Sequence, residues 1–423
     1  MPNDFKNIIA KSNFRYLWTS QILSQVTINI MNFLLLAKLY AVTGSSIATS
    51  LLWVAYALPA LVFGPIGAAT VDLVSRRKVL MIANLLQAIT IFLTIFVNQQ
   101  SIFILYAVVL IYSLLNQFYV PAESAYLPST ASKDDLPQAN SIFFLTSQAS
   151  LIFGFGFAGI IQRFIGFDGA LILCSIFLFV AFVSTSLLKE TTPGKKIPEE
   201  FEKALKAFFD SAIGGYVFIK ENKSVLYPLL LLLGLQASLA IIVVSLPVIA
   251  VQILGISVNF SGVSIVIPAG IGAILGSIYI PRLIKNGYRK KQIIESALIG
   301  IMASVLLISL GVPVVPLFYR VIITPMLLVL AGFSFVSINL PTLTYLQSAT
   351  PLWLRGRVFG NLYFLVTIVS VFPVLFSGAI TELFGIRTML SILALGTGAV
   401  LVYSKKHGDT MIKEKFVTGY NEK

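Results

Sequence analysis

The stretch that decides the fold runs from Gly64 to Leu80 and reads GPIGAATVDLVSRRKVL. It begins as an apolar helix, passes one acid, Asp72, and a cluster of three cations at 76–78, and then becomes apolar again. A basic hinge between two apolar segments is typical of a short loop on the cytoplasmic side of a membrane. An ordinary loop of this kind explains the cations but not Asp72, which could lie against the positive end of another helix.

The composition is that of an integral membrane protein. Of the 423 residues, 57% are hydrophobic and 11% are charged, whereas soluble proteins are about 45–50% apolar and about 25% charged. The net charge of +13 comes from loops between apolar segments, which form no basic face for nucleic acid. The single cysteine, Cys174, excludes an intramolecular disulfide, and the lone His407 has no metal-binding companions. Residues 1–12 are polar and the first apolar segment is too long for a signal peptide, so we expect no cleaved leader.

The apolar segments divide into two sets of six, each segment close to the length of about 20 residues that crosses a bilayer. We place the first set near residues 14–40, 46–71, 78–97, 101–127, 141–163 and 168–188. The second set lies near 225–252, 260–284, 292–311, 315–345, 357–384 and 387–403. The sequence therefore predicts an all-α membrane protein with twelve transmembrane helices. Its parts are an N-terminal bundle at 1–188, a linker at 189–224, a C-terminal bundle at 225–403 and a tail at 404–423.

The second half repeats the hinge at the same ordinal place. Residues 276–291, GSIYIPRLIKNGYRKK, again end a glycine-containing span with a basic cluster. The acid is missing, because Pro281 and Arg282 stand in its place. Two halves of six spans around a linker are typical of the internal repeats of transporters, and we expect pseudo-two-fold symmetry between them.

Most of the 30 Lys and Arg residues fall on one side of the predicted membrane. The exceptions are Lys38, Arg163, Arg320 and Arg387, near the opposite ends of their spans. Because Lys and Arg concentrate in cytoplasmic loops, we expect both termini and the linker in the cytoplasm and the protein in the cell (inner) membrane. Apolar residues at helical spacing within 199–223 predict an amphipathic helix on the membrane surface.

Two spans carry polar side chains along one helical face. They are Gln21, Gln25, Asn29 and Asn32 in the span 14–40, and Tyr112, Asn116, Tyr119 and Glu123 in the span 101–127. Such a face could line a water-filled substrate cavity, or it could hold helices together by hydrogen bonds. We favour the cavity, because hydrogen bonding between helices rarely needs four successive turns. In the second half Gln236 and Asn339 are the clearest polar candidates, and a cavity that is polar on one side suits an amphipathic or hydrophobic substrate.

Acids inside predicted spans are functional candidates, because a carboxylate in a membrane is costly to hold. Glu123 is the deepest acid of the first half and is our candidate for proton coupling. Its place toward the inner end of the span also allows a structural ion pair with a loop cation. Glu382 lies near the outer end of the span 357–384, where we interpret it as a surface group that could pair with Arg387.

These residues resemble the major facilitator superfamily of transporters over nearly the whole chain. The hinge at 64–80 resembles the signature of the loop between its second and third spans. Three further motifs resemble the branch that contains macrolide-efflux proteins and the enterobactin exporter: VPAESAYLP (120–128) with the later Asn140, GGYVFIKENKSVLYPLL (214–230) and LRGRVFG (354–360). The resemblance implies two six-helix bundles, alternating access and export driven by the proton gradient.

The sequence departs from the family pattern at three positions. Leu73 stands where the signature usually has a cation, Ile28 where this branch often has an acid, and Phe155 where a proline usually follows the glycine. In the hinge itself we expect Asp72 to contact the start of the span 357–384, at about 356–360, when the protein faces outward. The residues of this conformational lock would be Asp72, Arg76, Arg77, Arg355 and Arg357.

The sequence thus predicts a secondary transporter that exports a small amphipathic or hydrophobic molecule, with proton antiport as one mode. A lipid or lysolipid translocator is the alternative within transport, and a non-transporting receptor or scaffold is a weaker one. An enzyme would need clustered catalytic groups at one depth, and direct ATP drive would need a GxxxxGK[ST] loop; the sequence has neither. We expect a monomer with no cofactor or metal, whose partners are the substrate, the lipid bilayer and, if transport is proton-coupled, protons.

Overall fold

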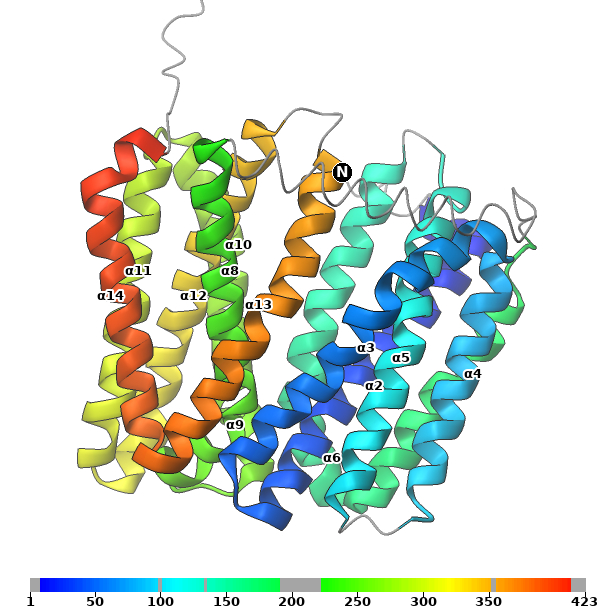
Figure 1. The fold of residues 1–423 in the computed structure, drawn as a ribbon, viewed down its shortest axis with the longest axis horizontal. Coiled ribbons are helices and arrows are strands. Elements are labelled where there is room, and N and C mark those ends of the chain that lie inside the picture. The colour runs from blue at the N-terminus through cyan, green and yellow to red at the C-terminus, as the bar shows by residue number, and fades with distance from the viewer. Residues whose placement is uncertain (1–7, 98–100, 133–134, 191–221, 351–354, 412–423) are drawn as a thin grey trace, which may run out of the picture. The chain divides into compact units, whose positions relative to one another are not determined.

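The computed structural model describes residues 8–97, 101–132, 135–190, 222–350 and 355–411, and all regular structure in these ranges is helical (Figure 1). The helices of the first half are α2 (Ser12–Thr43), α3 (Ser46–Leu73), α4 (Arg76–Thr94), α5 (Ile102–Tyr126), the short η1 (Leu127–Ser129) and α6 (Leu136–Ser186). In the second half α8 (Lys223–Val244), α9 (Leu246–Val248), η2 (Ile249–Leu254), η3 (Val258–Phe260), η4 (Gly262–Val266) and α10 (Ile267–Lys285) come first. They are followed by α11 (Lys290–Leu306), η5 (Leu307–Gly311), η6 (Val312–Val314), α12 (Leu317–Ala349), α13 (Arg355–Phe384) and α14 (Ile386–Met411).

The membrane-spanning character predicted from the sequence is confirmed. Eleven helical stretches in the described ranges are long and apolar enough to cross a membrane. One of them, Gln138–Ser186 within α6, contains the span predicted at 141–163 and covers the span predicted at 168–188 as far as residue 186. Gly166 lies between these two spans with φ 75° and ψ 175°, a conformation that breaks the helix there and that glycine adopts readily.

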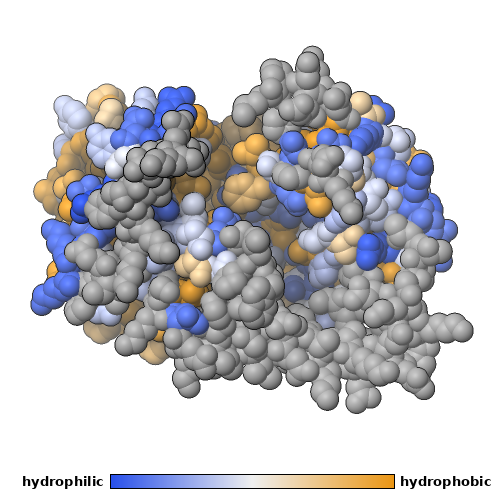
Figure 2. All heavy atoms as spheres, turned by 90° about the horizontal axis from the view of Figure 1, so that it is seen from above, coloured by the Kyte–Doolittle hydropathy of each residue, from blue (hydrophilic) through white to orange (hydrophobic). Residues whose placement is uncertain are grey.

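Lipid-facing surface explains the large apolar side chains that the helices leave uncovered. Phe103 is 85% exposed and Phe164 is 83% exposed, and a soluble protein rarely exposes broad apolar patches of this kind. On the face that is seen from above in Figure 2, hydrophilic residues lie among hydrophobic ones. Exposed apolar side chains such as Phe103 and Phe164 are what the hydrocarbon of a bilayer favours on a membrane-spanning helix.

The chain folds into two compact units. The first contains residues 1–210, 240–267 and 367–386, and the second contains 211–239, 268–366 and 387–423. The predicted halves, 1–188 and 225–403, divide the sequence at the linker, and their boundaries stay a prediction.

In the first unit α2 packs along α6, α3 packs on α5, and α4 packs on both α5 and α6. An apolar core lies where α2 and α4 begin and α5 ends, and it includes Phe14, Leu17, Leu80, Tyr119 and Tyr126. We call this end of the unit, next to residues 76–78, its basic side. The opposite end, next to Gly44 and Gly385, is the far side. In the second unit α11 packs on α12, around a core that includes Leu235, Leu298 and Ile338.

The hinge between α3 and α4 is shorter than the segment 72–77 that separates the predicted spans 46–71 and 78–97. Two residues separate the helices, and the backbone N–H of Val74 caps α3 by donating to the carbonyl oxygen of Thr70. Inside α3, a Cβ atom on Gly67 would lie 2.1 Å from the backbone oxygen of Gln117 on α5. The backbones of α3 and α5 therefore touch at this point, and only glycine fits there.

Lys11 and Asp135 tie the start of α2 to the start of α6 on the basic side. Their Nζ and Oδ2 atoms are 2.7 Å apart, and this hydrogen bond lowers the pKa of Asp135, which lies outside the spans. Because both side chains are substantially exposed, the pair orients the two helices more than it stabilises them.

Candidate functional site: a buried polar seam in the first unit

Four buried polar residues from three helices meet inside the first unit, and we call them the polar seam. They are Ser20 on α2, Asn84 on α4, and Tyr119 and Glu123 on α5. Ser20, Asn84 and Tyr119 are fully buried, and Glu123 is 7% exposed. The sequence analysis predicted Tyr119 and Glu123 as site residues, and the structure adds Ser20 and Asn84.

Helix geometry explains why these residues lie at one depth. Ser20 and Asn84 each lie eight residues after the first residue of their helix, and Tyr119 lies seven residues before the last residue of α5. At about 1.5 Å per residue, each of the three is roughly 12 Å inside the helix end. All three helix ends are on the basic side, so the three side chains share a level, and Glu123 lies one turn closer to that side.

The hydrogen bonds of the polar seam run in one direction. Asn84 Nδ2 donates to Ser20 Oγ over 3.0 Å, Ser20 and Tyr119 hydroxyls are 3.0 Å apart, and Tyr119 donates to Glu123 Oε1 over 3.0 Å. A tyrosine hydroxyl has a single proton. Since Tyr119 uses that proton in its hydrogen bond to Glu123, Ser20 must be the donor in the hydrogen bond between Ser20 and Tyr119. Every link of the chain therefore points toward the carboxyl group of Glu123.

Glu123 has no cationic partner in the described part of the chain. The ion pairs found there are Lys11–Asp135, Lys78–Glu190 and Lys291–Glu295. A buried carboxylate without a cation is costly to keep charged, so this group is chemically suited to binding and releasing a proton. The structural ion pair left open by the sequence does not form with any described cation.

Other buried oxygens near the seam lack a donor. Asn84 Oδ1 and Gln87 Oε1 on α4, Thr27 Oγ1 on α2 and the Tyr112 hydroxyl on α5 accept no hydrogen bond from a described residue. All four residues are at most 1% exposed. Buried polar atoms are usually hydrogen-bonded. The contact region of α2, α4 and α5 therefore holds more hydrogen-bonding atoms than the hydrogen bonds of the polar seam use.

The remaining predicted cavity residues are split between buried and half-buried positions. On α2, Gln21 Nε2 donates to the Phe143 carbonyl over 2.8 Å and Asn29 Nδ2 donates to the Gln25 carbonyl over 2.7 Å. Tyr112 is fully buried. Five side chains are half-buried: Gln25, Asn32 and Asn116 in the first unit, and Gln236 and Asn339 in the second. Their role in lining a substrate cavity stays a prediction.

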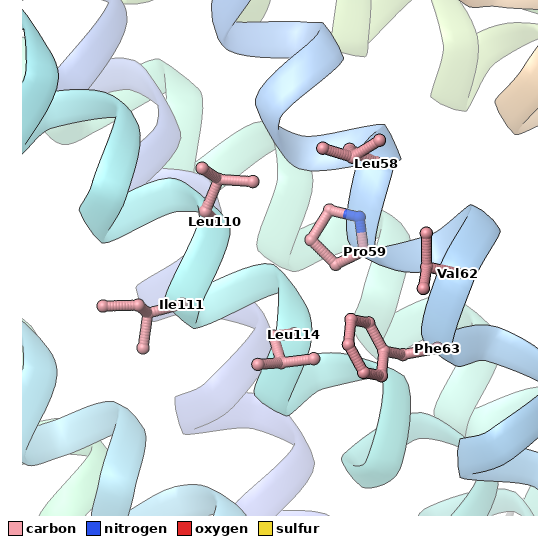
Figure 3. A pocket seen from close by; sticks show the side chains of 7 residues that line it. All are labelled: Leu58, Pro59, Val62, Phe63, Leu110, Ile111 and Leu114. Atoms are coloured by element: carbon pink, nitrogen blue, oxygen red, sulfur yellow. The ribbon is translucent and has the colours of Figure 1, made fainter.

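A groove between α3 and α5 is apolar throughout. It has a volume of about 250 Å³. Its lining residues are Leu58, Pro59, Val62, Phe63, Leu110, Ile111 and Leu114, whose side chains lie along the two helices in Figure 3. None of the predicted polar residues lines it, so it offers hydrocarbon contact and no hydrogen bonds.

Two of the predicted lock residues bind the ends of neighbouring helices. Arg76 Nη1 donates to the carbonyl oxygen of Ala125 over 2.8 Å, and Arg77 Nη2 donates to that of Ser186. These carbonyls lie in the last turns of α5 and α6, where a cation is favourable. The side chains of Asp72, Arg355 and Arg357 lie outside the described part of the structure, so the lock itself stays a prediction.

The long apolar helices of the described ranges place the chain among polytopic membrane proteins as a class. Residues 17–372 match the model of the Major Facilitator Superfamily. The chain belongs to this family, and the predicted superfamily is confirmed. This match identifies the superfamily and no branch within it. Membership of the branch that contains macrolide-efflux proteins and the enterobactin exporter stays a prediction.

Relatives and solved structures agree with this assignment. The chain is 24% identical over 387 residues to the uncharacterized MFS-type transporter YfiS of Bacillus subtilis (strain 168), covering 89% of this chain and 87% of YfiS. The crystal structure of the nucleoside transporter NupG matches with a TM-score of 0.71 and 15% identity, covering 95% of this chain and 99% of NupG. A bacterial homolog of the human lysosomal transporter Spinster, in an inward-facing and unoccupied conformation, matches with a TM-score of 0.75 and 12% identity, covering 97% and 99%. At these identities the solved structures show the fold alone.

Proposed function

We propose that the protein is a secondary active transporter that exports a small amphipathic or hydrophobic molecule by alternating access, in exchange for protons that bind Glu123. The observation that carries the proposal is the polar seam, a hydrogen-bond chain that ends on a buried carboxyl group with no described cationic partner. Membership of the family supports transport. The exporter-like motifs at 120–128 and 354–360 support the direction.

Antiport follows if substrate and proton compete for Glu123. Burial disfavours the charged carboxylate, while a cationic substrate close to it favours that form. A substrate that reaches Glu123 would then expel its proton, and release of the substrate would restore it. Half-buried Gln25, Asn32 and Asn116 would supply the polar contacts on the path of the substrate.

A lipid or lysolipid translocator is the second candidate. The apolar groove between α3 and α5 favours it, because its seven lining side chains fit a hydrocarbon chain better than a polar solute. A lysolipid would be amphipathic as well, so the two candidates differ in substrate and share the alternating cycle.

Transport of a substrate panel into proteoliposomes, with and without an imposed pH gradient, tests the proposal. The panel should contain cationic amphiphiles, neutral amphiphiles, a nucleoside and a fluorescent lysolipid. We expect gradient-stimulated uptake of at least one cationic amphiphile and none of the nucleoside. Uptake of the lysolipid alone would select the second candidate, and no protein-dependent transport of any amphiphile would contradict both.

Membrane sidedness follows from the positions of the cations and gives a direct prediction. Single cysteines at Asn98 and at Gly194, in a Cys174→Ser background, are expected to react with an impermeant maleimide from opposite sides of the membrane. The cysteine at residue 194 should be labelled only when the membrane is permeabilised or inverted, so that the reagent can reach the cytoplasmic face. Labelling of both positions from the same side would contradict the predicted topology.

Asp72→Asn is expected to shift the protein toward the inward-facing state. We propose that the Asp72 carboxylate rests on the start of α13 in the outward-facing state, where a helix terminus favours it by about 0.3–1 kcal/mol. Spin labels at Ser129 and Asn286, which the positions of the cations predict to face the cytoplasm, would report the distance between the two predicted halves there. Glu190→Gln is the matched control, because its pair with Lys78 is exposed. An unchanged distance distribution in Asp72→Asn would rule out the lock.

A further inference from the structure

Glu382, near the end of α13, lies at the first turn of α3. Its Oε2 atom accepts hydrogen bonds from the backbone N–H of Ser46 over 2.7 Å, the Ser45 hydroxyl over 2.9 Å and the backbone N–H of Ile47 over 3.2 Å. The first N–H groups of a helix have no partner within it, and the positive end of the helix favours an anion. Glu382 supplies an acceptor for these N–H groups and a negative charge for the helix end. It therefore caps α3 with a carboxylate from a helix more than 300 residues away in the chain.

Two further contacts continue this interface away from the far side. The indole Nε1 of Trp53 donates to Ser370 Oγ over 3.2 Å. A Cβ atom on Gly378 would lie 2.4 Å from Ser50 Oγ, so the α13 backbone lies directly on α3 there. Numbers rise along α3 as they fall along α13, which makes the two helices antiparallel neighbours within the first unit.

A second interface at the far side of the same unit consists mainly of close backbone contacts. A Cβ atom on Gly159 of α6 would lie 1.9 Å from the Asn259 carbonyl oxygen, and one on Gly262 would lie 2.1 Å from that of Phe155. The Arg163 guanidinium lies over the Phe260 ring at 5.0 Å from its centroid. Between α6 and the segment 258–266, backbone thus meets backbone, whereas between α3 and α13 a carboxylate meets a helix terminus.

The two kinds of contact respond differently to separation. A close backbone contact at a glycine loses packing when it parts, and no carboxylate or helix-end donor is exposed by the separation. A carboxylate that leaves a helix terminus exposes three donors and one charge at once, so this contact has two distinct states, made and broken. Such a contact is suited to defining whether the far side is closed.

We propose that Glu382 is a latch residue of the transport cycle, which holds residues 367–386 against the start of α3 while the far side is closed and releases them when it opens. The proposal rests on the alternating cycle of the proposed function. The latch at Glu382 and the lock at Asp72 would then form a pair of contacts between α3 and α13. Asp72, near the end of α3, is proposed to hold the start of α13, and Glu382, near the end of α13, holds the start of α3.

Spin-label distances between Leu51 on α3 and Leu383 on α13 test the latch. Both side chains are exposed, at 41% and 74%, so the labels leave the contacts intact. We expect a dominant short distance in the parent protein, and a closed-to-open ratio that falls about five-fold in Glu382→Ala. Glu382→Gln keeps an acceptor oxygen without the charge and should give an intermediate ratio. Asp168→Asn, an exposed acid of the first unit near Gly166, is the control and should leave the ratio unchanged.

Unchanged distance distributions in both Glu382 variants would overturn the proposal. If Glu382→Ala does not fold, Ser45→Ala replaces it, because that change removes one of the three donors and should shift the ratio in the same direction by less. An effect no larger than that of Asp168→Asn would then overturn the latch. The measurement needs no substrate, so its failure is distinguishable from a failure of the transport panel.

Discussion

Glu123→Gln is expected to abolish substrate transport driven by a pH gradient while leaving substrate exchange at equal pH partly intact. Glutamine keeps the size of the side chain and can still accept the Tyr119 hydrogen bond, but it cannot bind or release a proton. Exchange needs only reorientation of the loaded carrier, whereas accumulation needs the proton to be carried back. The measurement is uptake of a panel substrate into inverted vesicles, with and without an imposed gradient.

A structural role for Glu123 predicts a different result. Loss of a structural hydrogen bond would lower gradient-driven transport and exchange together, and both would keep their dependence on pH. The proton-binding role predicts that exchange by the variant no longer varies with pH. Glu190→Gln, a charge removed at an exposed position, is the matched control and should behave as the parent. Full gradient-driven transport by Glu123→Gln would remove Glu123 from the coupling mechanism.

Gly67→Ala is expected to destabilise the fold strongly, because it introduces a methyl group at the closest contact between α3 and α5. The added Cβ would lie 2.1 Å from the oxygen and 2.8 Å from the carbon of the Gln117 carbonyl. Both are backbone atoms, so relief requires the helices to separate. Overpacking of this kind costs about 1–3 kcal/mol, and we expect a clearly lower melting temperature in detergent.

Gly64→Ala is the matched control one turn away on the same helix. The nearest atom to its added Cβ would be the Gln117 side-chain oxygen at 3.9 Å, which is an ordinary contact. Alanine also favours a helix over glycine by about 1 kcal/mol, so this variant should melt at the parent temperature or slightly above it. Equal melting temperatures for the two variants would contradict the close approach of α3 and α5.

The spans could be predicted well from the sequence because few backbone structures are stable across a bilayer. Backbone groups in hydrocarbon must be satisfied within the segment, so apolar length alone indicates a helix. The same argument separates the spans 141–163 and 168–188 without a polar loop between them. The structure breaks the helix in the gap between these spans, at Gly166.

The polar seam shows what the sequence could not supply. Spacing along α5 put Tyr119 and Glu123 on one face, but spacing does not say which helix that face meets. Ser20 is small and Asn84 lies in a largely apolar span, so the sequence analysis singled out neither. The signal that could have found the partner helix is the pair of amides at Asn84 and Gln87, three residues apart on one face of α4.

Glu382 was missed for the same reason. Its sequence neighbours indicate a helix end at the membrane surface, and a surface ion pair with Arg387 was the nearest available interpretation. The actual partners are backbone N–H groups of Ser46 and Ile47. Backbone donors at a helix start carry no signature in the sequence of the acid that caps them, so only the packing of α13 against α3 reveals the contact.

Proton movement driven by substrate tests the central claim, that export is exchanged for protons at Glu123, most directly. Proteoliposomes are loaded with a transported amphiphile and a trapped pH-sensitive dye, and are then diluted into substrate-free buffer at the same pH. The account predicts that substrate efflux acidifies the interior in the parent protein, and that Glu123→Gln releases substrate without a pH change. Substrate efflux from the parent protein with no change in internal pH would contradict it.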